Sequence, residues 1–214
     1  MRPYRGSPHN EGAGPTRRSS GGVTRVTATE DATAIRPLEV GDAAELLEVR
    51  TASRAHLAAW EPAREESYFT LAAQEDLLEE ATRAWDEDRG FAFAVLDAAS
   101  GRIAGGVALS NIVRGAWQNA TVGYWLAADA TGHGHATRAV RLALAYGFSH
   151  CELHRVQAAV IPRNVASLAV VRRVGLRPEG TALRYLRIAG LWEDHEIFAA
   201  TLEDGPSLGL PSLG

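Results

Sequence analysis

The sequence has no lysine, a single cysteine and no long apolar run. Cys151 stands alone, so an internal disulfide is excluded, and the composition is compatible with a reducing compartment. No segment approaches the roughly 18 apolar residues of a transmembrane helix, and the N-terminus lacks the apolar core of a signal peptide. We therefore expect a cytoplasmic protein without a membrane partner.

A surplus of positive charge is also missing. All basic residues are arginine, acidic residues outnumber them, and the formal net charge is −4. General nucleic-acid-binding proteins usually carry excess positive charge, so we expect no DNA partner. The 214 residues, of which 46% are hydrophobic and 22% charged, fit one globular domain with a substantial core.

Both ends of the chain have the composition of loose segments. Residues 1–30 are dominated by Gly, Pro, Ser, Thr and Arg, and residues 205–214 read GPSLGLPSLG. Such segments bury too little apolar surface to offset the entropy of ordering. We expect a disordered N-terminal tail over 1–30, a folded domain over 31–204 and a flexible C-terminal tail over 205–214.

Strand and helix patterns alternate between these tails. Apolar spacing of the helical period and helix-capping residues predict helices within 41–60 and 71–87, over 134–149, and between Asn164 and Gly175. Runs rich in Val, Ile, Phe and Tyr predict a short strand from residue 34, strands over 91–97, 101–112, 119–127 and 155–161, and a hairpin around Gly190. The order predicts an α+β fold: a mixed, mostly antiparallel sheet of about seven strands, flanked by about four helices.

The stretch DATGHGHATRAV, residues 129–140, leads from a strand into a helix. Its two histidines raise the question of a metal site. The other candidate ligands, His150, Cys151 and His154, lie beyond a helix of about 15 residues, which spans over 20 Å. Because metal ligands must converge on one point, we expect no metal.

A phosphate site explains the same stretch better. Gly132 and Gly134 let the backbone approach a ligand closely, and the following helix points its unpaired amides into the loop. A strand, a glycine-rich loop and a helix in that order form a natural diphosphate site. Glycine also marks ordinary loops, so the motif alone leaves both interpretations open.

Several separated segments together resemble one family. The loop Thr131-Gly132-His133-Gly134-His135-Ala136 is similar to the Gln/Arg-x-x-Gly-x-Gly/Ala loop of the GCN5-related N-acetyltransferases. Residues 56–67, 110–126 and 184–199 resemble the RimJ/RimL branch, which acetylates protein N-termini. Residues 164–180 match the Asn-x-x-Ser…Gly-Phe-x-x-x-Gly pattern, with Leu176 in place of the aromatic. The resemblance runs from about residue 35 to residue 202.

The resemblance implies acetyl-CoA as co-substrate, held in a gap between two splayed parallel strands. The diphosphate would lie on the loop, where Thr131 departs from the usual Gln or Arg, and the pantetheine arm would pair with the preceding strand. Asn164 would contact that arm as well as cap its helix, and Ser167 would protonate the leaving thiolate as general acid. The cofactor-binding residues expected on this basis are Val122, Tyr124, Trp125, Gly132, His133, Gly134, His135, Ala136, Thr137, Asn164 and Ser167.

Simpler interpretations stay open for some of these side chains. Tyr124 and Trp125 also fit ordinary sheet packing, and Ser167 also fits a solvent-facing position on its helix. A general base is not evident, because Thr121 occupies the strand position where many family members carry Glu. Glu61, Glu193 and His195 are the substitutes.

The acceptor groove is expected at Trp60, Glu61, Tyr185 and His195, with Glu61 acting on the incoming ammonium. Trp60 is equally consistent with core packing, and Glu61 with a plain loop. An N-terminal α-amine has a pKa near 7.7–8.0, against about 10.4 for lysine, so a weak or water-mediated base suffices for it. We expect direct transfer to the N-terminus of a protein or peptide, a ribosomal protein being one candidate, by a monomer or homodimer. The alternatives are acetylation of a small-molecule amine, such as an antibiotic or polyamine, and a non-catalytic acetyl-CoA-binding module.

Overall fold

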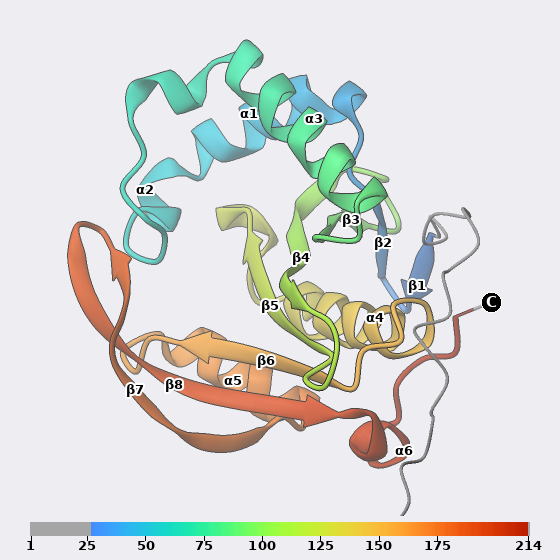
Figure 1. Cartoon of the computed structure of the whole chain (residues 1–214). Coiled ribbons are helices and arrows are strands. Elements are labelled where there is room, and N and C mark those ends of the chain that lie inside the picture. Colours follow the sequence, from blue (N-terminus) through green and yellow to red (C-terminus); the bar gives the residue numbers. More distant parts are fainter. Residues whose placement is uncertain (1–26, 214) are drawn as a thin grey trace, which may run out of the picture.

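The computed structural model describes residues 27–213, and an eight-stranded sheet runs through its middle (Figure 1). The strand order is β1-β2-β3-β4-β5-β6-β8-β7, and β5–β6 is the one parallel pair in the described sheet. The fold class expected from the sequence is confirmed, with eight strands instead of about seven. The strands are β1 (Ala28–Glu30), β2 (Thr33–Pro37), β3 (Phe91–Asp97), β4 (Ile103–Val113), β5 (Asn119–Leu126), β6 (Arg155–Val160), β7 (Arg177–Ile188) and β8 (Leu191–Thr201).

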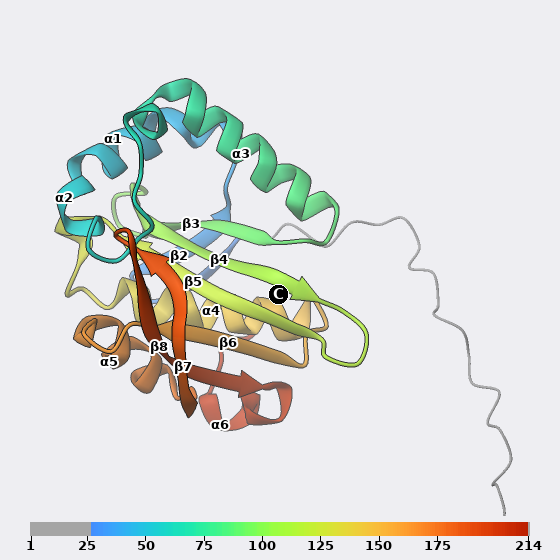
Figure 2. The same cartoon turned by 60° about the vertical axis from the view of Figure 1, so that its left-hand side comes forward.

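Helices cover both faces of the sheet. Figure 2 shows α1, α2 and α3 on one side of the strands and α4 and α5 on the other. Four helices have ten or more residues: α1 (Ala43–Ala52), α3 (Leu71–Asp86), α4 (His135–Ser149) and α5 (Val165–Val174). The remaining helices are short: α2 (Arg54–Leu57), α6 (Gly205–Leu208) and the 3-10 turns η1 (Val40–Asp42), η2 (Glu66–Phe69), η3 (Ala128–Ala130) and η4 (Leu202–Asp204). No helix within residues 27–213 is long and apolar enough to cross a membrane.

The alternation of side chains along β3 divides the apolar residues between two clusters. Phe91, Phe93 and Val95 face α4 and belong to the larger cluster, where Trp85 and Tyr146 pack edge-on against the phenylalanines. The smaller cluster lies under α1 and α3 and contains Leu46, Leu78, Ala94 and Ile103, with Trp125 packed against it. Each face of the sheet is therefore fixed by its own set of apolar contacts.

The parallel pair β5–β6 stays together over a short distance. Its register runs from Asn119–Arg155 to Thr121–Gln157, after which the two strands are no longer paired. β5 continues to Leu126 and β6 to Val160, so the strands diverge and leave a gap between them (Figure 1). The splayed central strands expected from the family resemblance are present.

The folded region extends beyond the expected boundaries at both ends. Ala28–Glu30 was expected in the tail but forms β1, which pairs antiparallel with β2. At the other end, Leu208, Leu210 and Leu213 pack against the main core, and Arg141 donates hydrogen bonds to the carbonyls of Leu208 (2.8 Å) and Gly209. The prediction of a loose end over 205–214 is therefore wrong for the described residues. The rest of the predicted N-terminal tail, residues 1–26, and Gly214 lie outside the described residues.

Candidate active site

The loop between β5 and α4 presents free main-chain amides. Gly132 and Gly134 have φ of 80° and 83°, values at which an L side chain is strained. Gly134 is the N-cap of α4 and offers no side-chain cap, so the first-turn amides of His135, Ala136 and Thr137 have no side-chain capping partner within residues 27–213. Together with the helix dipole, these amides suit a diphosphate. Thr131 cannot add to the positive charge, and its hydroxyl donates to the Ala128 carbonyl at 3.0 Å.

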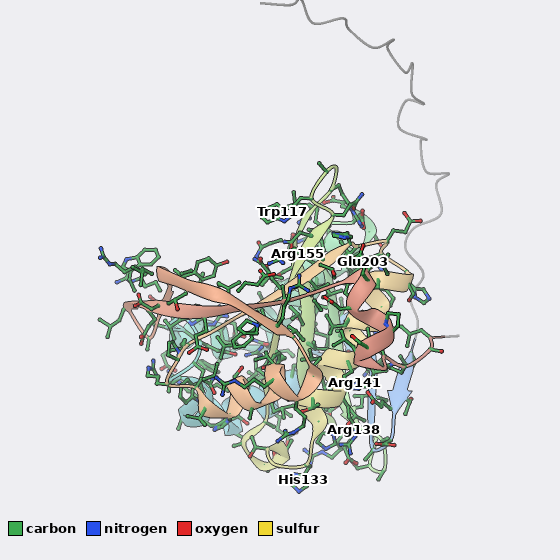
Figure 3. The ribbon with its side chains drawn as sticks, turned by 90° about the horizontal axis from the view of Figure 1, so that it is seen from below. Trp117, His133, Arg138, Arg141, Arg155 and Glu203 are labelled. Carbon is green, nitrogen blue, oxygen red and sulfur yellow. The ribbon has the colours of Figure 1, made fainter. Side chains whose placement is uncertain are left out.

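The two histidines of the loop have different environments. His133 is exposed, while His135 is buried, with its Nδ1 at 2.9 Å from Thr33 Oγ1 and its Nε2 at 3.6 Å from Asp97. The side chain of His135 is therefore held inside the protein by Thr33 and Asp97, while its main-chain amide belongs to the first turn of α4. Figure 3 shows His133 and Arg138 together at one end of the molecule, and Trp117 and Arg155 at the opposite end. Arg138 secures the loop by donating to the His133 carbonyl at 2.9 Å.

A hydrogen bond crosses the gap between β5 and α5. The hydroxyl of Tyr124 lies 2.6 Å from Ser167 Oγ, and burial raises the pKa of Tyr124 to about 12, against an opposing effect of that hydrogen bond. Asn164 caps α5, its Oδ1 accepting from the Ser167 amide at 3.0 Å. Ser167 is half-buried and paired, so it does not face solvent freely. Both hydroxyls lie where β5 and β6 diverge.

The side chains of β5 alternate between the two faces. Val122 and Tyr124 point to the α4–α5 side and join the main core, and Trp125 points to the α1 side. Both residues for which sheet packing was the alternative, Tyr124 and Trp125, thus pack against apolar clusters, on opposite faces of the sheet. Beyond Thr121, the edge of β5 that faces β6 has no paired strand within residues 27–213. The main chain of β5 is therefore unpaired where it borders the gap.

Contacts around Arg163 and Ala189 join three segments that are distant in the sequence. Arg163, just before α5, donates to the Ala59 carbonyl at 3.2 Å and pairs with Glu193 of β8 at 2.7 Å. Its guanidinium also lies 5.0 Å from the ring centroid of Trp60. The Ala189 amide, at the tip of the β7–β8 hairpin, donates to the Glu61 carbonyl at 3.1 Å. Trp60, Glu61 and the hairpin are therefore close together in the fold.

Glu61 is not free to act alone. Arg50 Nη1 lies 3.4 Å from each of its carboxylate oxygens, and Arg64 Nε lies 4.0 Å from one of them. Two guanidinium groups thus compensate the charge of Glu61, which opposes the expected role of an isolated carboxylate that acts on an ammonium group. A cavity of about 290 Å³ adjoins Glu61, between α1, α2, η2 and Ala189.

His195 is buried beside Tyr185, with ring centroids 5.5 Å apart in an edge arrangement. Its Nδ1 lies 3.0 Å from the Glu193 carbonyl. A carbonyl oxygen only accepts hydrogen bonds, so this contact assigns the proton of neutral His195 to Nδ1 and leaves the lone pair on Nε2. Thr121, in contrast, has only the Gln157 side chain near its hydroxyl, at 3.4 Å.

A larger cavity of about 580 Å³ lies on the α1 side of the loop between β5 and α4. Its lining includes Ser53, Asp97, Arg102 and His133, and comes from α1, the β3–β4 turn and residues 127–135. None of the lining residues belongs to β6 or α5, so this cavity lies outside the gap.

Comparison with known proteins fits this geometry. A family model described as an acetyltransferase (GNAT) domain matches residues 33–177. The chain belongs to the GNAT acetyltransferase family. It is therefore an acetyltransferase, and acetyl-CoA is its co-substrate.

Three similar proteins define its position within the GNAT family. A probable N-acetyltransferase of Bacillus subtilis, YjcK, is 37% identical, covering 77% of this chain and 91% of the relative. The structure of ribosomal-protein-S5-alanine acetyltransferase from Vibrio fischeri is 34% identical, with a TM-score of 0.79, over 84% of this chain and 98% of that one. Mycobacterium smegmatis RimJ, in complex with CoA-disulfide, is 30% identical with a TM-score of 0.78, over 85% and 91%. The expected RimJ/RimL resemblance is thus confirmed.

The geometry of the β5–α4 loop and of β5 fits the cofactor, independently of the family comparison. Uncapped amides at α4 suit the diphosphate, and the unpaired edge of β5 suits an arm built from amides. The sequence pattern did not indicate Arg50 or Arg163. Their importance comes from contacts between segments far apart in the chain, and no local motif signals it.

Proposed function

We propose that this acetyltransferase modifies the N-terminal α-amine of a protein or peptide. The observation that carries the proposal is the β7–β8 hairpin, whose tip contacts Glu61 through the Ala189 amide. Its exposed apolar side chains give a polypeptide a surface to lie on, next to the cavity at Glu61. These side chains are Leu183, Leu186, Leu191 and Trp192, each at least 44% exposed. The similarity to enzymes named for S5 alanine supports a ribosomal protein as the acceptor.

Ser167 is the proposed general acid. The thioester of acetyl-CoA supplies the acetyl group and a thiolate leaving group. As the amine nitrogen bonds to the carbonyl carbon and the C–S bond breaks, Ser167 Oγ donates its proton to the sulfur, and the proton that the amine loses returns to Ser167 Oγ by way of the base and solvent. Tyr124 holds that hydroxyl in place at 2.6 Å, and Asn164 holds its backbone amide.

Among the proposed bases, His195 is the one that we favour. Its Nδ1 is committed to the Glu193 carbonyl, so Nε2 is available to take the proton that the amine loses. Glu193 is paired with Arg163 and Glu61 with Arg50, so both carboxylates are already engaged. An α-amine needs only modest help, since its pKa of about 7.7–8.0 leaves a sizeable neutral fraction at neutral pH.

The test is release of free CoA thiol with a panel of N-terminal peptides, small amines and lysine side-chain acceptors. We expect turnover with free N-termini and none with N-terminally blocked peptides. Turnover only with a polyamine or antibiotic would contradict the proposal. Acetyl-CoA binding without any thiol release would instead indicate a non-catalytic module. In cells, loss of N-terminal acetyl groups after gene deletion, measured by mass spectrometry, identifies the acceptor.

A further inference from the structure

The cavity beside Glu61 has a charge that a simple amine pocket does not explain. Its volume is about 290 Å³, and its lining contains Arg50, Arg54 and Arg64 with Glu61 as the single acidic residue. A pocket that receives only an ammonium group would be expected to carry negative charge, because opposite charges attract across a partly enclosed space. The lining is instead predominantly positive.

One of the three guanidinium groups is fully paired. Arg54 donates to both carboxylate oxygens of Glu66, at 3.0 and 2.5 Å, in the fork arrangement typical of strong pairs. Its guanidinium carbon lies 4.3 Å from the ring centroid of Phe69. Arg54 therefore has its counter-charge outside the cavity lining, and its charge is neutralised there.

Arg50 is held differently. Its guanidinium carbon lies 4.1 Å from the Trp125 ring centroid and 5.6 Å from that of Tyr68, and its side chain is 15% exposed. A single nitrogen, Nη1, faces both oxygens of Glu61 at 3.4 Å, longer than the roughly 2.7–2.9 Å of a strong charge-assisted bond. The aromatic rings fix the plane of the group, and only one of its nitrogens contacts Glu61.

Arg64 adds a second positive charge on the same side. It lies 4.5 Å from the Tyr68 ring centroid and 4.0 Å from Glu61, and it is 40% exposed. With Arg54 neutralised by Glu66, Arg50 and Arg64 exceed Glu61 by one positive charge. The cavity therefore has one uncompensated cation and a rigid, half-enclosed guanidinium to bind an anion.

We propose that this cavity binds a carboxylate of the acceptor, with Arg50 as the principal ligand and Arg64 as the second. A guanidinium group matches the planar carboxylate in shape and charge. The inference rests on the proposed function, since it places an acidic side chain close behind the α-amine of the acceptor. It selects polypeptides whose first residues include Asp or Glu.

The test compares paired peptides that begin with alanine and carry Glu or Gln at one of the next three positions. The measured quantity is the Glu/Gln ratio of kcat/KM for thiol release. We expect a ratio of about ten or more for the wild-type enzyme, since hydrogen bonds to charged groups contribute more than neutral ones. Arg50→Met keeps the apolar stem between Trp125 and Tyr68 and should lower the ratio to about one.

Arg54→Met is the matched control. Arg54 lines the same cavity and also covers an aromatic ring, but its guanidinium is already paired with the Glu66 carboxylate and is not expected to bind the acceptor. Its Glu/Gln ratio should equal that of the wild-type enzyme. Glu61→Gln removes the competing carboxylate and should raise the ratio. If Glu61 instead holds the ammonium, Glu61→Gln would lower kcat/KM for both peptides alike and leave the ratio unchanged, which overturns the proposal.

Further outcomes separate this inference from the proposed function. Equal turnover of all free N-termini would retain the proposed function and refute the carboxylate site. Turnover of free glutamate but of no peptide would retain the carboxylate ligand and reject the polypeptide acceptor, overturning the proposed function and with it the selection of acidic N-termini. If no amine is acetylated, the proposed function is rejected, and the carboxylate selection that rests on it is rejected with it. Acetyl-CoA binding by Arg50→Met, measured by calorimetry, shows that the variant is folded.

Discussion

The hydroxyl of Tyr124 on β5 lies 2.6 Å from the hydroxyl of Ser167 on α5, across the gap between the diverging parallel strands. This contact links β5, whose pairing with β6 ends at Thr121, with the helix that Asn164 caps. Burial raises the pKa of Tyr124 to about 12, so its phenol stays protonated throughout the neutral range. Tyr124 thus acts as a neutral hydrogen-bonding partner that fixes the position of Ser167.

Ser167→Ala should lower kcat about tenfold to a hundredfold, since it removes the proposed proton donor. Tyr124→Phe keeps the ring but frees the Ser167 hydroxyl, so we expect a smaller loss of kcat. Because Tyr124 stays protonated near neutral pH, neither variant should change the slope of kcat against pH in that range. Thiol-release kinetics measure both, with the melting temperature as control for folding. Full kcat in Ser167→Ala would reject the general-acid role.

Gly134→Ala should weaken acetyl-CoA binding several-fold. The residue has a φ of 83°, and an added Cβ would lie 2.6 Å from Arg138 Nη1, displacing the group that holds the His133 carbonyl. The strained backbone should also cost about 1–3 kcal/mol of stability. Titration calorimetry gives the affinity and urea unfolding gives the stability. Gly41→Ala is the control, because Gly41 has ordinary φ and open space around it. Wild-type affinity in Gly134→Ala would contradict the loop assignment.

The sequence was sufficient for features that depend on neighbouring residues. The capping Asn164, the terminal Gly175 and the glycine loop lie where their local patterns predict them, because caps and turns are decided within a few residues. The choice of β5 as the strand that borders the gap followed from the family resemblance and not from a local pattern. The family resemblance supplied the order of these pieces.

Features that depend on distant residues could not be predicted. His135 turns inward because Thr33, 102 residues earlier, offers it a hydrogen bond. Arg64 is a sequence neighbour of Glu61, but the second guanidinium beside Glu61 comes from Arg50, which only the fold of α1 brings next to it. Residues 28–30 are ordered because β2 gives them a pairing partner, although their composition is that of a loose segment.

Leu208→Ala should destabilise the protein by about 1–2 kcal/mol, as expected when a partly buried leucine loses its contacts. A methyl group of Leu208 lies so close to Gly175 that a Cβ on that glycine would be 2.7 Å from it. Leu202→Ala is the matched control, because Leu202 is 50% exposed. Urea unfolding measures both variants. Equal stability of the two would show that the C-terminal segment contributes little to the fold.

The buried His135 makes stability depend on pH. Burial lowers its pKa, Asp97 acts in the opposite direction, and His133 and Arg138 lower it further. Because the folded-state pKa lies below the unfolded value of about 6.5, the unfolded chain binds more protons as pH falls. The contribution is therefore complete above the unfolded pKa and is lost as pH decreases toward and through the folded pKa.

His135→Asn keeps a polar partner for Thr33 but cannot take up that proton. The wild-type protein should lose more unfolding free energy than this variant between about pH 7.5 and about pH 5. His56→Asn, on the exposed face of α2, should behave like the wild-type protein and controls for the loss of a histidine as such. Urea unfolding at each pH supplies the numbers. The same pH dependence in His135→Asn and wild type would mean that other groups cause it, and the burial of His135 would then have no part in acid sensitivity.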